Sequence, residues 1–78
     1  MMKIDIEKIK RLRIENKISL DKMAVALGYK SPTGYYYLEK GRCAVNAVQL
    51  PIIAKMLGIN DIRDLYVTIE PTEPVDKL

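Results

Sequence analysis

The chain has 78 residues, 49% of them hydrophobic and 29% charged, with a net charge of +3. This length predicts one small domain with a modest core, which helix packing and dimerisation would have to stabilise. A lone cysteine, Cys43, excludes an internal disulfide, and because histidine is absent we expect neither a metal site nor a cofactor.

Positive charge is concentrated in the first part of the chain. Residues 1–66 hold twelve Lys/Arg and seven Asp/Glu, a balance of +5, whereas residues 67–78 hold one lysine and three acidic residues. A basic region before an acidic tail is typical of proteins that bind a polyanion, although +5 alone is ordinary. Without a signal-peptide core or a long apolar run, we expect a cytoplasmic protein with no membrane contact.

The first helix is predicted from apolar residues that recur every three positions. These residues are Ile6, Ile9 and Leu12, and Asp5 is a suitable N-cap before them. Arg13 lies one turn beyond Ile9 on the same side of this helix. A guanidinium turned toward a core requires a carboxylate or carbonyl partner.

Two short helices joined by a tight turn are predicted for residues 19–39. Ser19 is a suitable N-cap for the first of them. Gly28 follows its last apolar residue, where glycine adopts a left-handed C-cap at low cost. The residues expected to face inward are Met23, Ala24 and Leu27.

The second of these two helices leaves much of its surface uncommitted. Ser31 supplies an N-cap, and Pro32 supplies a first helical residue whose φ is already suitable. Tyr35 and Leu38 are spaced to face inward. The residues left to point elsewhere are Thr33, Tyr36, Tyr37 and Lys40. This arrangement is typical of proteins that place a helix in a DNA groove.

A loop and a fourth helix follow. Gly41 is expected to end the preceding helix, and residues 43–47 lack helix signals. Pro51 is tolerated only near the start of a helix, which predicts a helix over residues 49–57. Its inward residues would be Leu50, Ile53, Ala54 and Leu57.

The end of the chain predicts one more short helix and a tail. Asn60 is the expected cap of the helix, which would contain Ile62, Leu65 and Tyr66. Residues 67–78 begin with β-type residues and then carry two prolines, so we expect a disordered tail or an extended arm. The sequence thus predicts an all-α domain of five helices over residues 1–66.

An ordered set of residues within 6–66 carries a family resemblance. The set consists of Arg13, Ile18-Ser19, Met23-Ala24, Leu27-Gly28, Tyr35, Leu38, Glu39, Gly41 and the segment 50–59. With these residues at matching spacing, the chain resembles the phage repressor and Cro family of Xre-like helix-turn-helix domains. The resemblance implies a compact five-helix repressor-like fold that binds double-stranded operator DNA as a homodimer.

The resemblance also implies roles for particular residues. An arginine of the first helix pairs with the glutamate that ends the third and braces the recognition helix, which here gives Arg13 and Glu39. The residues that would contact DNA are Ser19, Lys30, Ser31, Thr33, Gly34, Tyr36, Tyr37, Lys40 and Arg42. We expect the dimer interface at Tyr66, Val67 and Ile69, because these residues have no evident cover within the chain.

Three features depart from the family pattern. Leu20 stands where the family commonly has a glutamine that bonds phosphate, and Gly34 would provide only room. Tyr36 and Tyr37 replace the usual amide-bearing readers. A phenol can bond phosphate or a base edge, and its ring can contact a thymine methyl, but tyrosine is also enriched at protein interfaces.

The sequence therefore predicts a sequence-specific transcription regulator, a repressor that inserts residues 32–39 in the major groove. One alternative is a protein-interaction module that presents the tyrosines, Leu20 and the apolar loop to a partner protein. Another is an antitoxin-like protein whose tail wraps a toxin. We expect no enzyme, because no histidine is present and no nucleophile has an evident activating partner.

Overall fold

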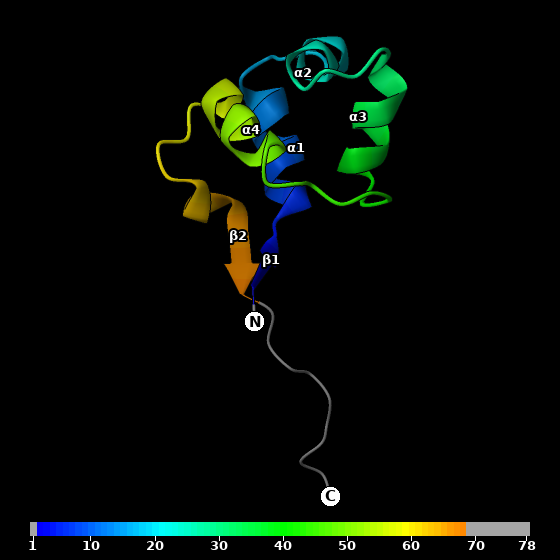
Figure 1. The fold of residues 1–78 in the computed structure, drawn as a ribbon. Helices are drawn as coiled ribbons and strands as arrows, with labels where there is room; N and C mark the ends of the chain where they lie inside the picture. Colours follow the sequence, from blue (N-terminus) through cyan, green and yellow to red (C-terminus); the bar gives the residue numbers. More distant parts are fainter. Residues whose placement is uncertain (1, 69–78) are drawn as a thin grey trace, which may run out of the picture.

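A computed structural model describes residues 2–68 of the protein (Figure 1). It is mostly helical, with four α-helices, one 3₁₀ turn and a two-stranded sheet in this part of the chain. In chain order, the elements are β1 (Met2–Ile4), α1 (Ile6–Glu15), α2 (Leu20–Ala26), α3 (Pro32–Glu39), α4 (Gln49–Leu57), η1 (Ile62–Leu65) and β2 (Tyr66–Thr68).

The last helix of the five-helix expectation is a single 3₁₀ turn, η1. Its cap is Asp61, whose side chain accepts a hydrogen bond from the Arg63 amide at 3.0 Å, so the expected cap at Asn60 is wrong. Tyr66 leaves the turn and enters β2. Four residues between a cap and a strand are too few for a regular α-helix, and i→i+3 bonds suit such short pieces.

A small two-stranded sheet adds to the all-α expectation, with which the mostly helical fold is broadly consistent. β1 pairs with β2 in antiparallel register, with Lys3 opposite Val67. The expected boundary between residues 66 and 67 therefore falls inside a strand, and Val67 belongs to the folded domain. Residues 69–78, which include Ile69 of the expected dimer interface and most of the expected tail, lie outside the described residues.

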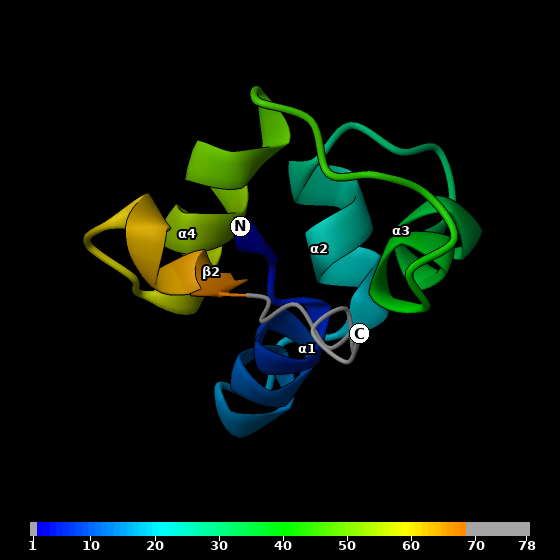
Figure 2. The same ribbon diagram turned by 90° about the horizontal axis from the view of Figure 1, so that it is seen from below.

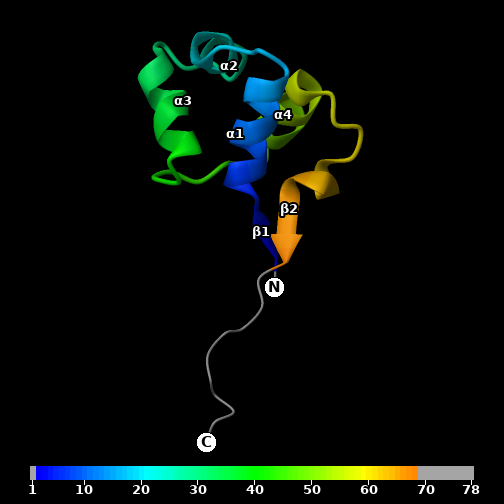
Figure 3. The same ribbon diagram turned by 180° about the vertical axis from the view of Figure 1, so that it is seen from behind.

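One core is shared by the four α-helices and η1. It consists of Ile9, Met23, Ala24, Tyr35, Leu38, Leu50, Ile53, Ala54, Leu57 and Leu65. Figure 2 shows α3 and α4 on opposite sides of α1. In Figures 1 and 3, α2 lies at the end of the molecule away from the paired strands. The inward residues expected for the second, third and fourth helices are confirmed, with Leu27 only partly buried.

Two short helices joined by a tight turn form at α2 and α3, as the sequence predicts. The Ser19 hydroxyl accepts a hydrogen bond from the Lys22 amide at 3.0 Å, which caps α2. Gly28 has φ +85°, and the Tyr29 amide beyond it donates to the Ala24 carbonyl at 2.9 Å. This reversal satisfies carbonyls at the end of α2 and directs the chain into α3.

The start of α4 is fixed by a side-chain exchange that we did not anticipate. The Asn46 side chain accepts bonds from the amides of Val48 and Gln49, and the Gln49 side chain accepts one from the Asn46 amide at 3.0 Å. This is a capping box with Asn and Gln three residues apart. The Gln49 side-chain amide also donates to the Tyr29 hydroxyl at 2.9 Å, which links α4 to the turn before α3.

Candidate nucleic-acid interface

An ion pair between Arg13 and Glu39 ties the end of α3 to α1. Arg13 Nε donates to Glu39 Oε2 at 2.6 Å, and Nη2 donates to Oε1 at 3.2 Å. Arg13 Nη1 donates to the Ile18 carbonyl at 2.8 Å. The two side chains are only 12% and 5% exposed, so this bidentate pair is largely shielded from solvent. The pair fixes the C-terminal end of α3 against α1.

Tyr35 lies beside this pair in the core and is fully buried. Its hydroxyl has no partner with hydrogen-bond geometry among the described residues. Burial, and then the nearby Glu39 carboxylate, raise the pKa of the Tyr35 phenol well above its ordinary value. Tyr35 therefore contributes an uncharged ring to the core. The next two residues, Tyr36 and Tyr37, are exposed on the outer side of α3.

Four side chains form an aromatic–cationic cluster at the exposed end of α3, namely Tyr36, Tyr37, Lys40 and Arg42. The two rings lie 5.9 Å apart between centroids and are tilted by 53°. Lys40 Nζ lies 5.3 Å from the Tyr36 ring, and Arg42 Cζ lies 5.6 Å from the Tyr37 ring. Each cation is thus attracted to the face of one tyrosine. The cluster presents two positive charges and two phenols on one surface.

Three further expected contacts lie at or just before the N-terminal end of α3. Lys30, Ser31 and Thr33 are all exposed. Ser31 occupies the N-cap position, but its side chain makes no capping hydrogen bond, so the expected cap contact is absent. Its hydroxyl is free to bond elsewhere.

Gly34 does not provide the free room that the sequence indicated. A Cβ atom built there would lie 2.5 Å from Cδ1 of Tyr29. The Tyr29 ring therefore covers the direction in which a side chain at this position would project. Gly34 therefore allows close packing between the turn and α3.

The beginning of α2 lies next to the cluster, but its first residues already make contacts within the domain. Ser19 is exposed, and its hydroxyl already caps the helix. Leu20 is half-buried and packs against the core. It lines a small hollow with Tyr36 and Lys40. The hollow places the start of α2 beside the cluster on α3.

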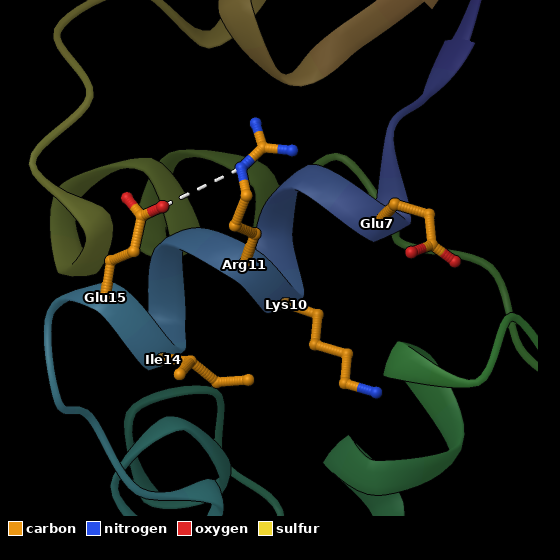
Figure 4. A pocket seen from close by; sticks show the side chains of 5 residues that line it. All are labelled: Glu7, Lys10, Arg11, Ile14 and Glu15. Atoms are coloured by element: carbon orange, nitrogen blue, oxygen red, sulfur yellow. Dashed lines mark ion pairs between the residues drawn. The ribbon is translucent and has the colours of Figure 1, made fainter.

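Lys10 of α1 also lines this hollow, and we did not single it out from the sequence. In Figure 4, Lys10 and Arg11 extend from α1 in different directions, and Arg11 approaches Glu15. The Arg11–Glu15 pair spans 3.9 Å, and both side chains are 60% exposed. Lys10 precedes Arg13 by one helical turn, and that spacing could have indicated that Lys10 faces α3. Lys10 adds a third cation beside the cluster.

Two of the three expected dimer residues, Tyr66 and Val67, lie in β2. Tyr66 is half-buried and packs against the core, so the chain itself partly covers this side chain. Val67 is 38% exposed. Both lie at the sheet end of the molecule, away from α2 (Figure 3).

No protein-family model, curated protein or solved structure matches this chain. Within residues 2–68, no helix has the length and apolar character needed to span a membrane. The same residues contain no group of three or more His, Cys, Asp or Glu placed to hold a metal ion.

Proposed function

We propose that the protein is a sequence-specific DNA-binding transcription regulator of the phage repressor/Cro (Xre-like) type. It inserts α3 into the major groove, binds a two-fold related site as a homodimer and acts as a repressor. The observation that most supports this proposal is the aromatic–cationic cluster on the exposed side of a braced second helix of a helix-turn-helix.

The geometry suits a polyanion because the cations and the exposed helix share one surface. Lys40 and Arg42 follow the C-terminal end of α3, and Lys10 approaches from α1. Cations beside a helix inserted in the groove would bond phosphates and set its position. The Arg13–Glu39 pair stabilises α3 in that position, because it links the helix end to α1 by two hydrogen bonds.

The decisive experiment measures the affinity of the full chain for duplex DNA as a function of salt concentration. The probes are duplexes enriched from a randomised pool and an unselected duplex of the same length. Contacts with phosphates release counterions, so log affinity should fall linearly with log salt. Absence of binding to every duplex at low salt would exclude this function.

Single-charge variants test the surface that the structure indicates. Lys40→Ala, Arg42→Ala and Lys10→Ala should each reduce the slope of log affinity against log salt by about 1, because each removes one phosphate contact. Arg11→Ala is the matched control, since it removes a cation from the same helix as Lys10 but on another side (Figure 4). An equal effect of Arg11→Ala would show that only the net charge matters.

Exposed apolar side chains favour a second candidate, a protein-interaction module. Val25 and Val48 are 68% and 73% exposed, in addition to the two tyrosines of the cluster. Leu20 supports this candidate less than the sequence indicated, because it packs against the core. The antitoxin-like alternative depends on the tail, which lies outside residues 2–68.

Replacing Tyr37 separates these candidates. Under the DNA-binding proposal, Tyr37→Ala weakens binding to the enriched duplexes more than binding to the unselected one, because base-edge contacts carry sequence information. Equal losses of affinity for the two duplexes would indicate that Tyr37 contacts the DNA backbone. No loss of affinity for either duplex would favour the interaction module.

A further inference from the structure

We propose that α3 recognises thymine in the major groove through its C5-methyl group, with the rings of Tyr36 and Tyr37 as the contacting surface. This inference rests on the proposed DNA-binding function. It specifies which base, and which atom of that base, provides the sequence preference.

The first argument is the chemistry available on α3. Guanine is read by arginine or lysine, adenine by asparagine or glutamine, and cytosine by a carboxylate. Between Pro32 and Glu39, α3 contains no lysine, arginine, asparagine or glutamine. Its one carboxylate, Glu39, accepts two hydrogen bonds from Arg13 and is 5% exposed. The usual polar readers of the other three bases are therefore absent from the helix or already committed.

The second argument is what remains exposed. Tyr36 and Tyr37 are each 42% exposed, and Thr33 is exposed one turn earlier. These residues present aromatic carbon, a methyl group and hydroxyls. On the major-groove edge, the apolar group that distinguishes one base is the methyl of thymine. Apolar contact with this methyl is the readout that the helix surface fits best.

The third argument is the position of the two cations after the helix. Gly41 has φ +75°, and beyond it the Arg42 amide donates to the Tyr37 carbonyl at 3.0 Å. The chain therefore reverses, and Arg42 lies against the Tyr37 ring instead of continuing along the helix axis. Lys40 lies in the same way against Tyr36. Each cation is held at one ring. In the proposed complex, the cation would contact a DNA phosphate, and the part of the ring that it leaves exposed would contact a base edge.

The test replaces thymine by deoxyuridine in the enriched duplexes. This exchange removes the methyl and preserves every hydrogen-bonding group of the base. Each methyl buried against a ring should contribute about four-fold in affinity, the equivalent of about 0.8 kcal/mol. We expect one or more thymine positions with such a loss in the wild-type chain, and no loss when an unselected duplex receives the same exchange.

Protein variants assign the effect to the rings. Tyr36→Ala or Tyr37→Ala should abolish the difference between the thymine and deoxyuridine duplexes at the contacted position, because these variants have no ring to bury the methyl. Tyr36→Phe and Tyr37→Phe should retain that difference. Ile62→Ala is the matched control, since Ile62 is 40% exposed and lies on η1.

Two results would overturn the inference while leaving the proposed function intact. One is salt-dependent binding to the enriched duplexes that is equal for thymine and deoxyuridine at every position. The other is a loss confined to duplexes in which 7-deazaguanine replaces guanine, which would assign base reading to Lys40 or Arg42. Failure of the proposed function has a different signature, because then no duplex binds at low salt.

Discussion

Lys17 has φ 57°, and it is the one residue other than glycine with a positive φ in the described part of the chain. The chain reverses direction there, just after α1. The Lys17 amide donates to the Ile14 carbonyl, and the Ile18 amide donates to the Arg13 carbonyl at 3.0 Å. The other three α-helices end in the same reversal with a glycine at the left-handed position. Lysine at this position is strained, because its Cβ atom crowds the backbone in that conformation.

Lys17→Gly should therefore raise the free energy of unfolding by about 1 kcal/mol, the strain released minus the entropy that glycine adds to the unfolded chain. Urea unfolding monitored by circular dichroism measures this change. Lys10→Gly is the control, because the same exchange inside a helix should destabilise the domain by about 1 kcal/mol. A loss of stability for both variants would show that the strain at Lys17 is negligible.

Tyr35 gives the domain a specific dependence on alkaline pH. Its raised pKa keeps the phenol protonated in the folded state, whereas the unfolded phenol ionises near its ordinary pKa of 10.0. The contribution of this phenol to stability is therefore complete below about pH 10 and is lost as the pH rises above that value. Tyr35→Phe removes the titration.

At neutral pH, Tyr35→Phe should change stability little or raise it by up to about 1 kcal/mol, because the removed hydroxyl has no hydrogen-bond partner within residues 2–68. Above about pH 10, the free energy of unfolding of the variant should rise relative to that of the wild type by about 1.4 kcal/mol per pH unit. Urea unfolding between about pH 8 and about pH 11 measures both effects. Tyr36→Phe, at an exposed ring, is the control, and a parallel decline of wild type and Tyr35→Phe would contradict this account.

At the scale of elements, α3 is positioned by contacts with its neighbours. Glu39→Gln should lower the free energy of unfolding by about 1–3 kcal/mol, because it leaves the Arg13 guanidinium shielded and without its counter-charge. Thermal and urea unfolding measure the loss. The double variant Arg13→Met with Glu39→Leu should recover part of it, since two apolar side chains of similar size leave no charge unpaired.

The Asp61–Arg63 pair is the control for this prediction. Arg63 Nη2 lies 2.7 Å from Asp61 Oδ2, but the two side chains are 83% and 41% exposed. Arg63→Met should therefore alter stability much less than Glu39→Gln. An unchanged melting temperature for Glu39→Gln would show that the Arg13–Glu39 pair does not stabilise α3.

The Tyr29 ring packs on Gly34, and this packing predicts that Gly34→Ala changes stability in the direction opposite to helix propensity. Alanine ordinarily stabilises a helix interior relative to glycine by about 1 kcal/mol. Gly34→Ala should instead destabilise the domain, because its Cβ atom would lie 2.5 Å from Tyr29 Cδ1. The Tyr29 ring cannot move freely, since its hydroxyl bonds Gln49. Chemical unfolding of Gly34→Ala is compared with that of the double variant that also carries Tyr29→Ala. The comparison measures whether alanine stabilises α3 once the Tyr29 ring is removed. A stabilising Gly34→Ala would mean that the ring yields at little cost.

At the scale of the whole molecule, the paired strands bring the two ends of the described chain together. The Asp5 amide donates to the Leu65 carbonyl at 2.7 Å, and Lys8 Nζ donates to the Asp64 carbonyl at 2.8 Å. Val67 of β2 is exposed opposite Lys3, and a hollow lined by Lys3, Glu39 and Lys40 lies between β1 and the end of α3. Under the proposed function, the surface around the exposed Val67 would contact a second copy of the chain.

Val67→Glu tests whether this surface mediates the proposed dimer. The new carboxylate would stand opposite Lys3 within the chain, which favours the strand pair, but two copies would bring like charges together. We expect a shift from dimer to monomer in sedimentation equilibrium, with weaker binding to a two-fold related duplex and unchanged binding to a single half-site. Ile62→Glu on η1 is the control. A dimer that survives Val67→Glu would place the interface elsewhere.

Local sequence patterns were sufficient to predict the four α-helices and the turn between α2 and α3. Apolar spacing at Met23, Tyr35 and Leu38 identified the buried sides of α2 and α3, and Ser19 and Gly28 marked the two ends of α2. These features were predictable because capping and helical periodicity act over a few residues, so their signals lie close together in the chain. The capping signal at the start of α4 is equally local, because Asn46 and Gln49 are three residues apart.

Contacts between residues far apart in the chain became apparent only in the folded domain. Val67 finds a strand partner at Lys3, Tyr29 covers Gly34, and Lys10 reaches the hollow beside Tyr36. No local pattern specifies such contacts, since each depends on how complete helices pack around the shared core. The candidate site follows the same division. The exposure of Tyr36 and Tyr37 was readable from helical spacing, whereas the seating of each cation on a ring depends on the folded arrangement at the end of α3.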